Sequence, residues 1–181
     1  PDGQRYWFVA HANHQVWMGS LPDSHSLING ILSLSRAYLL TGDRTYSHKA
    51  LVLLHRVAAV YPSMNYEQQS RFGQLMGEQG TRYTGKILNL IWESNLVAPS
   101  LAEAYDNLWE TVDGDTALQK FYGRTGEQIR ADIEANYLED AIDAYFADKL
   151  RANYGIHQRA LLILAVVRQH GDNARYVNEV L

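Results

Sequence analysis

The sequence predicts an all-α protein in which αα-hairpins form an α/α solenoid or part of an incomplete (α/α) toroid. Apolar residues recur at helical spacing along most of the 181-residue chain, no alternating strand pattern persists, and turn or capping signals separate the helical stretches. About four hairpins of roughly 40 to 50 residues fit this spacing, which is the size of helical-pair repeats. We expect residues 1–181 to form a single helical domain.

The clearest predicted hairpin spans residues 27–62. An apolar face marks its first helix, formed by Leu27, Ile31, Leu34 and Tyr38. Gly42 fits the left-handed position after a helix, and Asp43 can cap the helix that follows. The second helix is expected to stop at Pro62. So short a connection predicts two antiparallel neighbours.

The middle of the chain predicts a loop and then further helices. Residues 63–85 are rich in Gly and Gln without a sustained period, which indicates a long loop. A helix is expected over about 86–94, and Ser100 with Glu103 forms a capping-box pattern that predicts a new helix start. Residues 113–115 should break that helix. Thr125 with Gln128 forms a second capping box, leading into one bent or two straight helices over residues 129–150.

The last strongly apolar helix begins after a polar segment, Ala152 to Gln158. Asn153 occupies a position typical of an N-cap, which predicts a helix start there. Two apolar faces follow, one with Ile156, Ala160, Ile163 and Val167, the other with Tyr154, Leu161 and Leu164. A helix that is apolar on two faces is expected to be buried on both sides.

Composition excludes several classes of function. A net charge of -4 and a pI near 6.0 give no broad basic surface, so nucleic acid is not expected as a partner. No apolar run is long enough for a membrane span, and the absence of Cys excludes thiolate chemistry. The 12 Tyr and 4 Trp against 4 Phe suit a wet groove that stacks on sugars, or equally half-buried helix positions.

Asn153 and His157 are the first candidate site. His157 follows four residues later, about 6 Å further along the same helix face. Near the positive end of a helix dipole, His157 is expected to stay neutral and able to accept a proton. Tyr154, Gln158 and Arg159 complete a polar face at the start of the helix. The alternative is that Asn153 is only a cap.

Two other clusters are candidates for binding. His11 and His14, with His25, could bind zinc, but the third ligand of a zinc motif is missing, so we expect no metal. These histidines, His14 among them, are expected to line a polar groove or to fill an aromatic seam between helices. Trp92, Glu93 and Asn95 could hold a sugar by stacking and hydrogen bonds. The alternative places Trp92 in the core and Glu93 in solvent.

Four passages resemble the helical N-terminal region of the heparinase II/III-like polysaccharide lyases, a family that includes alginate lyases. They are DGQRYWFVAHANHQVW (2–17), SRAYLLTGDRTYSHKALVLLHRVAAVYP (35–62), GKILNLIWESNLVAPSLAEAYDNLW (85–109) and ANYGIHQRALLILAVV (152–167). The resemblance spans nearly the whole chain. It implies an incomplete α/α toroid that is followed by a β-sheet domain, with the active cleft between the two.

The resemblance also implies a reaction, the β-elimination of a uronic-acid-containing polysaccharide without a cofactor. By resemblance, Asn153 would neutralise the uronate carboxylate, His157 would support the site or act as an auxiliary base, and Arg159 or Arg151 would add local positive charge. The family's catalytic Tyr lies on a later helix. We therefore expect this chain to be part of a lyase, inactive alone, whose later helices and β domain are its partners.

Two rival functions stay open at this point. A glycoside hydrolase on the same fold would need two carboxylates across one cleft, and Glu93 with Glu78, Glu103 or Asp106 shows no such pairing. A non-catalytic helical module could bind a glycan or a protein on a concave face. For a polymer-degrading lyase, the periplasm or the outside of the cell is expected, although the chain begins at Pro1 without a signal peptide.

Overall fold

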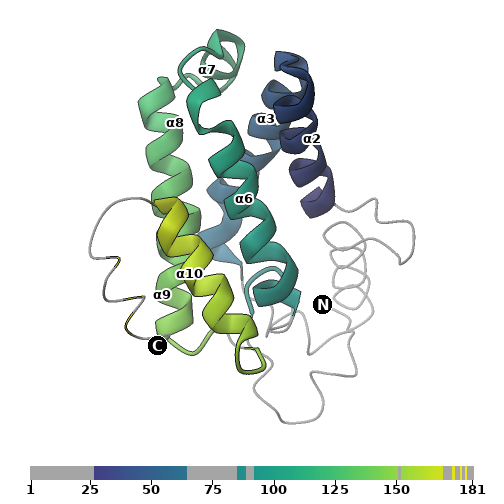
Figure 1. Ribbon diagram of the computed structural model, residues 1–181. Coiled ribbons are helices and arrows are strands. Elements are labelled where there is room, and N and C mark those ends of the chain that lie inside the picture. The colour runs from purple at the N-terminus through teal and green to yellow at the C-terminus, as the bar shows by residue number, and fades with distance from the viewer. Residues whose placement is uncertain are drawn as a thin grey trace, which may run out of the picture.

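The computed structural model describes residues 27–64, 85–88, 92–150 and 152–168, together with Asn173, Tyr176 and Asn178. Every element in these ranges is helical and none is a strand, which confirms the predicted all-α class (Figure 1).

Helices α2 (Leu27–Thr41) and α3 (Arg44–Val60) form the predicted hairpin. Gly42 adopts the left-handed conformation at φ 69°, which a residue with a side chain rarely takes, and its N–H donates to Tyr38 O at 2.7 Å. Asp43 caps α3, because its carboxylate accepts the Thr45 N–H at 2.8 Å. A 3₁₀ turn, η1 (Tyr61–Ser63), carries Pro62 and ends the hairpin, as predicted.

The next helical run differs from the prediction, because the helix expected from about residue 86 is absent at 86–88 and the helix expected to begin at Ser100 begins earlier. Residues 86–88 are not helical, whereas the π-helical segment η3 (Glu93–Val97) continues directly into α6 (Ala98–Leu108). Pro99 lacks an N–H and cannot bond the carbonyl four residues back, and the Ala98 N–H instead donates to Glu93 O, five residues back. Ser100 is therefore buried inside a helix, and its prediction as a cap is wrong.

The next two helices begin at capping residues in the sequence. After a 3₁₀ turn, η4 (Trp109–Thr111), Asp115 caps α7 (Thr116–Tyr122). Thr125 caps α8 (Gly126–Ile133) in a complete capping box, as predicted. The π-helical segment η5 (Glu134–Glu139) then joins α8 to α9 (Asp140–Phe146) in one continuous run.

Replacing Thr125 with alanine should cost about 1 kcal/mol of stability, the usual effect of losing an N-cap. The Thr125 hydroxyl accepts the Gln128 N–H at 3.2 Å, and the Gln128 side chain accepts the Thr125 N–H at 3.0 Å. Urea unfolding measures the change. Thr116→Ala, at an exposed threonine that caps no helix, should stay within about 0.5 kcal/mol of wild type. Equal losses in the two variants would contradict the capping role.

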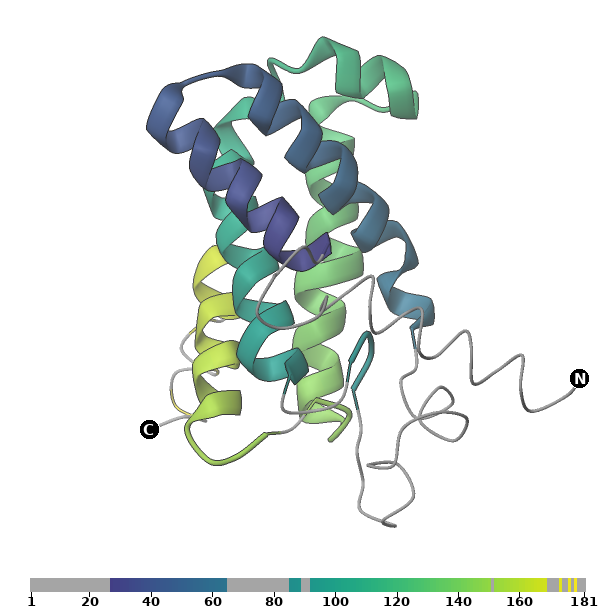
Figure 2. The ribbon, with the colours of Figure 1, turned by 90° about the vertical axis from the view of Figure 1, so that its right-hand side faces the viewer.

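The contacts arrange the helices in two layers (Figures 1 and 2). Helices α2, α6 and α10 (Ile156–Arg168) lie in one layer, and α3 with the α8–η5–α9 run lies in the other. The face of α6 predicted from its spacing fills the core between them, with Leu101, Tyr105, Leu108 and Val112 all buried. Closure of these layers into a toroid stays a prediction.

Helix α10 is partly buried and keeps an exposed side at Arg159 and Val166. Ala160, Leu161, Leu164 and Ala165 face the core, and the helix packs on α6, η3, α9 and η5. Val166 is 65 % exposed and Tyr154, ahead of the helix, is 88 % exposed. On the two predicted faces, Ala160, Leu161 and Leu164 are buried, while Ile156, Ile163 and Val167 are half-buried, so the predicted burial is only partial. Tyr154 belongs to the surface.

Candidate functional site

The predicted catalytic residues lie in a turn at one end of the bundle. The Ile156 N–H donates to Asn153 O at 3.0 Å, so Asn153 opens a turn and α10 begins three residues later. The predictions that Asn153 caps the helix and shares a helix face with His157 are therefore wrong. Gly155 makes the turn at φ 88°, and the Asn153 side chain is exposed.

Hydrogen bonds to its own side chains hold this turn in place. The Gly155 N–H donates to the Gln158 side-chain oxygen at 2.6 Å. His157 Nδ1 lies 2.9 Å from Ala152 O. Because a carbonyl only accepts, Nδ1 carries the hydrogen, and Nε2 of the neutral ring then holds the lone pair. Gln158 and His157 thus fix the backbone that presents Asn153.

The turn and the first turn of α10 together carry functional groups that could bind a sugar acid. Asn153, Tyr154 and Arg159 are exposed and offer an amide donor, an aromatic face and a cation. The half-buried His157 ring packs against Tyr145 at 5.3 Å between ring centroids, which limits its rotation. Its Nε2 could accept a proton or a hydrogen bond from a ligand. Arg151 and His14 lie outside the described residues.

The second predicted cluster does not form one surface. Asn95 is exposed, Trp92 is half-buried and Glu93 is 0 % exposed. Direct contact between Glu93 and a sugar is not compatible with this burial, and neither is the alternative that placed Glu93 in solvent. Both predictions for Glu93 are wrong, because tertiary packing closes over η3, which contacts α6 and α10.

Glu93 instead is the acceptor for a buried polar cluster. One of its oxygens accepts the Ile87 and Leu88 N–H groups, each at 2.8 Å, and the other accepts the Tyr61 hydroxyl at 3.0 Å. Segment 85–88, which has no regular secondary structure, is thereby attached to the core. Burial raises the pKa of Tyr61 well above its usual value, so the phenol stays protonated and donates.

A buried cation completes this cluster. Lys86 pairs with Asp140, and its ammonium group lies 4.6 Å from the centre of the Tyr61 ring. Tyr137 contacts the edge of the Tyr61 ring at 5.0 Å and donates to Ala98 O at 3.0 Å. The cluster joins η1, segment 85–88, η3 and the η5–α9 run.

Burial raises the pKa of Glu93 from its ordinary value of 4.5 to about 7, despite the opposing effect of its hydrogen bonds and of Lys86. Between these two values the folded state retains a proton that the unfolded state has lost. Raising the pH from about 5 to about 8 should therefore lower the free energy of unfolding by about 2 to 3 kcal/mol through this group. The stabilisation from the retained proton is fully present below pH 4.5 and is lost as the pH rises above 7.

Urea unfolding over that pH range, on wild type and Glu93→Gln, measures this linkage. The glutamine keeps a carbonyl acceptor for the two N–H groups and cannot ionise. The difference between the two stability curves isolates the contribution of Glu93. Identical pH slopes would contradict it.

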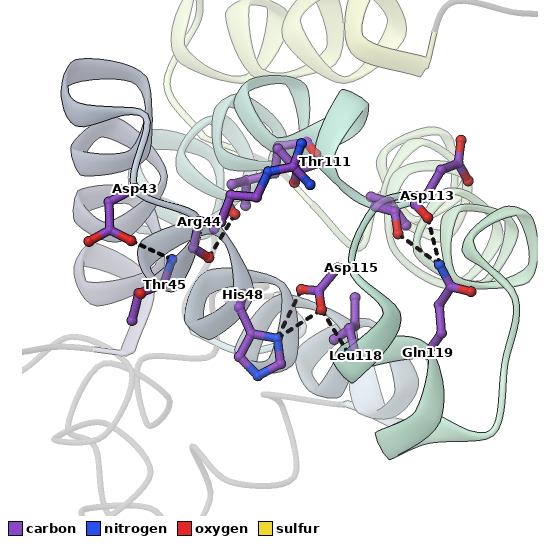
Figure 3. Close-up of polar contacts among 12 residues, drawn as sticks. Asp43, Arg44, Thr45, His48, Thr111, Asp113, Asp115, Leu118 and Gln119 are labelled. Atoms are coloured by element: carbon purple, nitrogen blue, oxygen red, sulfur yellow. Dashed lines mark hydrogen bonds and ion pairs between the residues drawn. The ribbon is translucent and has the colours of Figure 1, made fainter.

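A third polar cluster was not predicted. A groove of about 340 Å³ lies between the first turns of α3 and the segment that leads into α7 (Figure 3). His48 Nδ1 lies 2.9 and 3.1 Å from the two oxygens of Asp115, and Arg44 lines the same groove. Figure 3 shows Arg44 extending toward Thr111 and His48 toward Asp115, so that both side chains of α3 approach one connecting segment.

Sequence reasoning could not have found this groove. His48 and Asp115 are 67 positions apart, and Asp115 was recognised only as part of a helix break. The one available signal was Arg44 directly after a cap, where a cation opposes the helix dipole. Lys86, Tyr61 and Asp140 were missed for the same reason, since their partners are distant in sequence.

No group of three or more His, Asp or Glu side chains is placed to hold a metal ion in the described part of the chain. His11, His14 and His25 lie outside it, so the possible zinc site is not tested. Among the helices that are described, none is long and apolar enough to cross a membrane.

Comparison of the chain with protein-family models, with curated proteins and with solved structures finds no match. A functional assignment must therefore be argued from the residues and their geometry.

Proposed function

We propose that this chain is the helical portion of a heparinase II/III-like polysaccharide lyase, which cleaves a uronic-acid-containing polysaccharide by β-elimination. The observation that carries the proposal is the exposed group of Asn153 and Tyr154, which precede α10, and Arg159, which lies in the first turn of that helix. Hydrogen bonds of Gln158 and His157 hold the backbone on either side of Asn153, and the exposed Asn153 amide is accessible as a donor to a negatively charged group.

Each group has a role in the proposed reaction. The Asn153 amide donates to the uronate carboxylate and stabilises the negative charge that develops as the C5 proton leaves. Arg159 attracts the acidic polymer, and Tyr154 stacks on a sugar ring. His157 Nε2 supports the site as an acceptor or auxiliary base. The later helices and the β domain of the whole lyase supply the Tyr or His that takes the C5 proton and the Tyr that protonates the leaving oxygen. The reaction takes place in the periplasm or outside the cell.

The rival functions have less support. For a glycoside hydrolase, Glu93 is buried, Glu103 pairs with Arg36 at 2.6 Å, and Glu78 lies outside the described residues. A non-catalytic module would be favoured by Asn153 and His157 that both point into packed core, whereas Asn153 is exposed and His157 is half-buried.

The reaction class is tested with the whole lyase, the protein that contains this helical portion, on alginate, heparan sulfate and chondroitin sulfate. β-Elimination creates a C4–C5 double bond, so we expect a product with new ultraviolet absorbance and no oxygen from ¹⁸O-labelled water. A product that incorporates the label and lacks the absorbance would establish hydrolysis instead. Strong lyase activity of residues 1–181 alone would contradict the view that the catalytic Tyr lies elsewhere.

A further inference from the structure

The groove beside α3 is a polar site that the proposed lyase chemistry does not use. It lies at the end of the bundle near α7, whereas the first turn of α10 lies at the opposite end (Figures 1 and 2). Its volume of about 340 Å³ is within the range of small-molecule sites. The exposed residues Thr45 and Thr116 contribute to its lining.

Arg44 gives this groove a cation that forms no ion pair with a carboxylate of the described residues. No carboxylate of the described residues lies within ion-pair distance of its guanidinium. Arg44 is the first residue of α3, where the helix dipole already places positive charge. Its Nη1 would lie 2.6 Å from a Cβ built on Gly114, so the side chain rests directly on the bare backbone of the turn.

The carboxylates near Arg44 are already used in helix caps. Asp43 accepts the Thr45 N–H at 2.8 Å. Asp115 accepts the Leu118 N–H at 2.8 Å as well as His48 Nδ1, and its side chain is only 11 % exposed. A ligand anion would therefore not have to displace an internal partner of Arg44.

His48 is oriented by its carboxylate and remains open to the groove. Because Asp115 accepts from Nδ1, a neutral His48 ring carries its lone pair on Nε2, and the side chain is 38 % exposed. His55, on the same helix, makes a comparable bond to Asp132 at 3.0 Å but is buried, which identifies that pair as a packing contact. Only the first of these two His–Asp pairs lines the groove.

We propose that this groove binds a small hydroxylated carboxylate of the sugar-acid type. The Arg44 guanidinium pairs with the ligand carboxylate, and His48 Nε2 and the threonine hydroxyls bond its hydroxyl groups. A planar carboxylate matches the guanidinium fork, whereas a dianion would bring a second negative charge near Asp43 and Asp115. The proposal does not depend on the lyase assignment, because it uses none of the residues around Asn153.

The test is a titration of residues 1–181 with sodium glucuronate, followed by NMR. We expect saturable shifts of the Thr45 and Thr116 amides and of the His48 ring signals. Arg44→Ala should raise the dissociation constant at least about tenfold, as expected when a charge-assisted pair is lost. Gly114→Ala should also weaken binding, since its Cβ displaces the guanidinium while keeping the charge. Arg56→Ala, at an exposed arginine of the same helix, is the matched control and should bind as wild type does.

Several outcomes would overturn the proposal. They are shifts that do not saturate, equal affinity of Arg44→Ala and Arg56→Ala, or an equally strong response to uncharged glucose. An equal response to inorganic phosphate would replace the carboxylate site with a general anion site. Asn153→Ala should leave this titration unchanged, so failure here and failure of the lyase proposal remain distinguishable. Circular dichroism confirms that each variant is folded.

Discussion

Replacing Glu93 with alanine is expected to lower the free energy of unfolding by about 3 to 5 kcal/mol. The substitution leaves the N–H groups of Ile87 and Leu88 and the Tyr61 hydroxyl without their acceptor in a fully buried position. It also opens a cavity, which adds to the cost. Removing a carboxylate that is costly to bury offsets part of this loss, but three orphaned donors outweigh it.

The matched control is Glu103→Ala, which makes the same chemical change at a partly exposed site. Glu103 pairs with Arg36 at 2.6 Å, and exposed pairs of this kind contribute about 0 to 1 kcal/mol. Urea unfolding at one pH compares the two variants. Glu93→Gln should recover most of the loss, because its carbonyl oxygen can accept the Ile87 and Leu88 N–H groups and its NH2 group can donate to the Tyr61 oxygen. A loss in Glu93→Ala no larger than that in Glu103→Ala would show that water takes over the role of the carboxylate.

If the chain belongs to the proposed lyase, Asn153→Ala in the whole enzyme is expected to reduce kcat by roughly 10²- to 10³-fold, about 2.7 to 4 kcal/mol of barrier, as when an oxyanion donor is lost. The amide stabilises charge that exists only as the C5 proton leaves, so kcat should fall far more than KM rises. Initial rates measured by ultraviolet absorbance over a range of polymer concentrations give both constants.

Stability measurements separate this role from a structural one. The Asn153 side chain is exposed and makes no hydrogen bond to another described residue, so the melting temperature of Asn153→Ala should match that of wild type. Asn153→Asp, which keeps the shape but places a negative charge against the uronate, should lose as much activity. A variant that melts earlier yet retains its rate would remove the catalytic assignment.

The local signals in the sequence determined the helices and many of their ends. Gly42 and Asp43 set the turn between α2 and α3, and Thr125 with Gln128 set the start of α8, because each acts on backbone groups at most four residues away. The apolar spacing of α6 likewise predicted which of its residues are buried. Such features depend on neighbours within about one helical turn and can be read from contiguous residues.

The tertiary structure decided which predicted helix starts do not form and which polar groups from distant parts of the sequence are in contact. Ser100 and Glu103 form the same local pattern as Thr125 and Gln128, yet η3 continues into α6 because its residues pack against the core. Glu93 is a buried acceptor because η3 packs against α6 and α10, and His48 bonds Asp115 across 67 positions because α3 packs beside α7. The physical reason is the sequence separation of the interacting groups. Caps and periodicity depend on bonds along one helix, whereas burial, pKa shifts and long-range pairs depend on how separate helices pack.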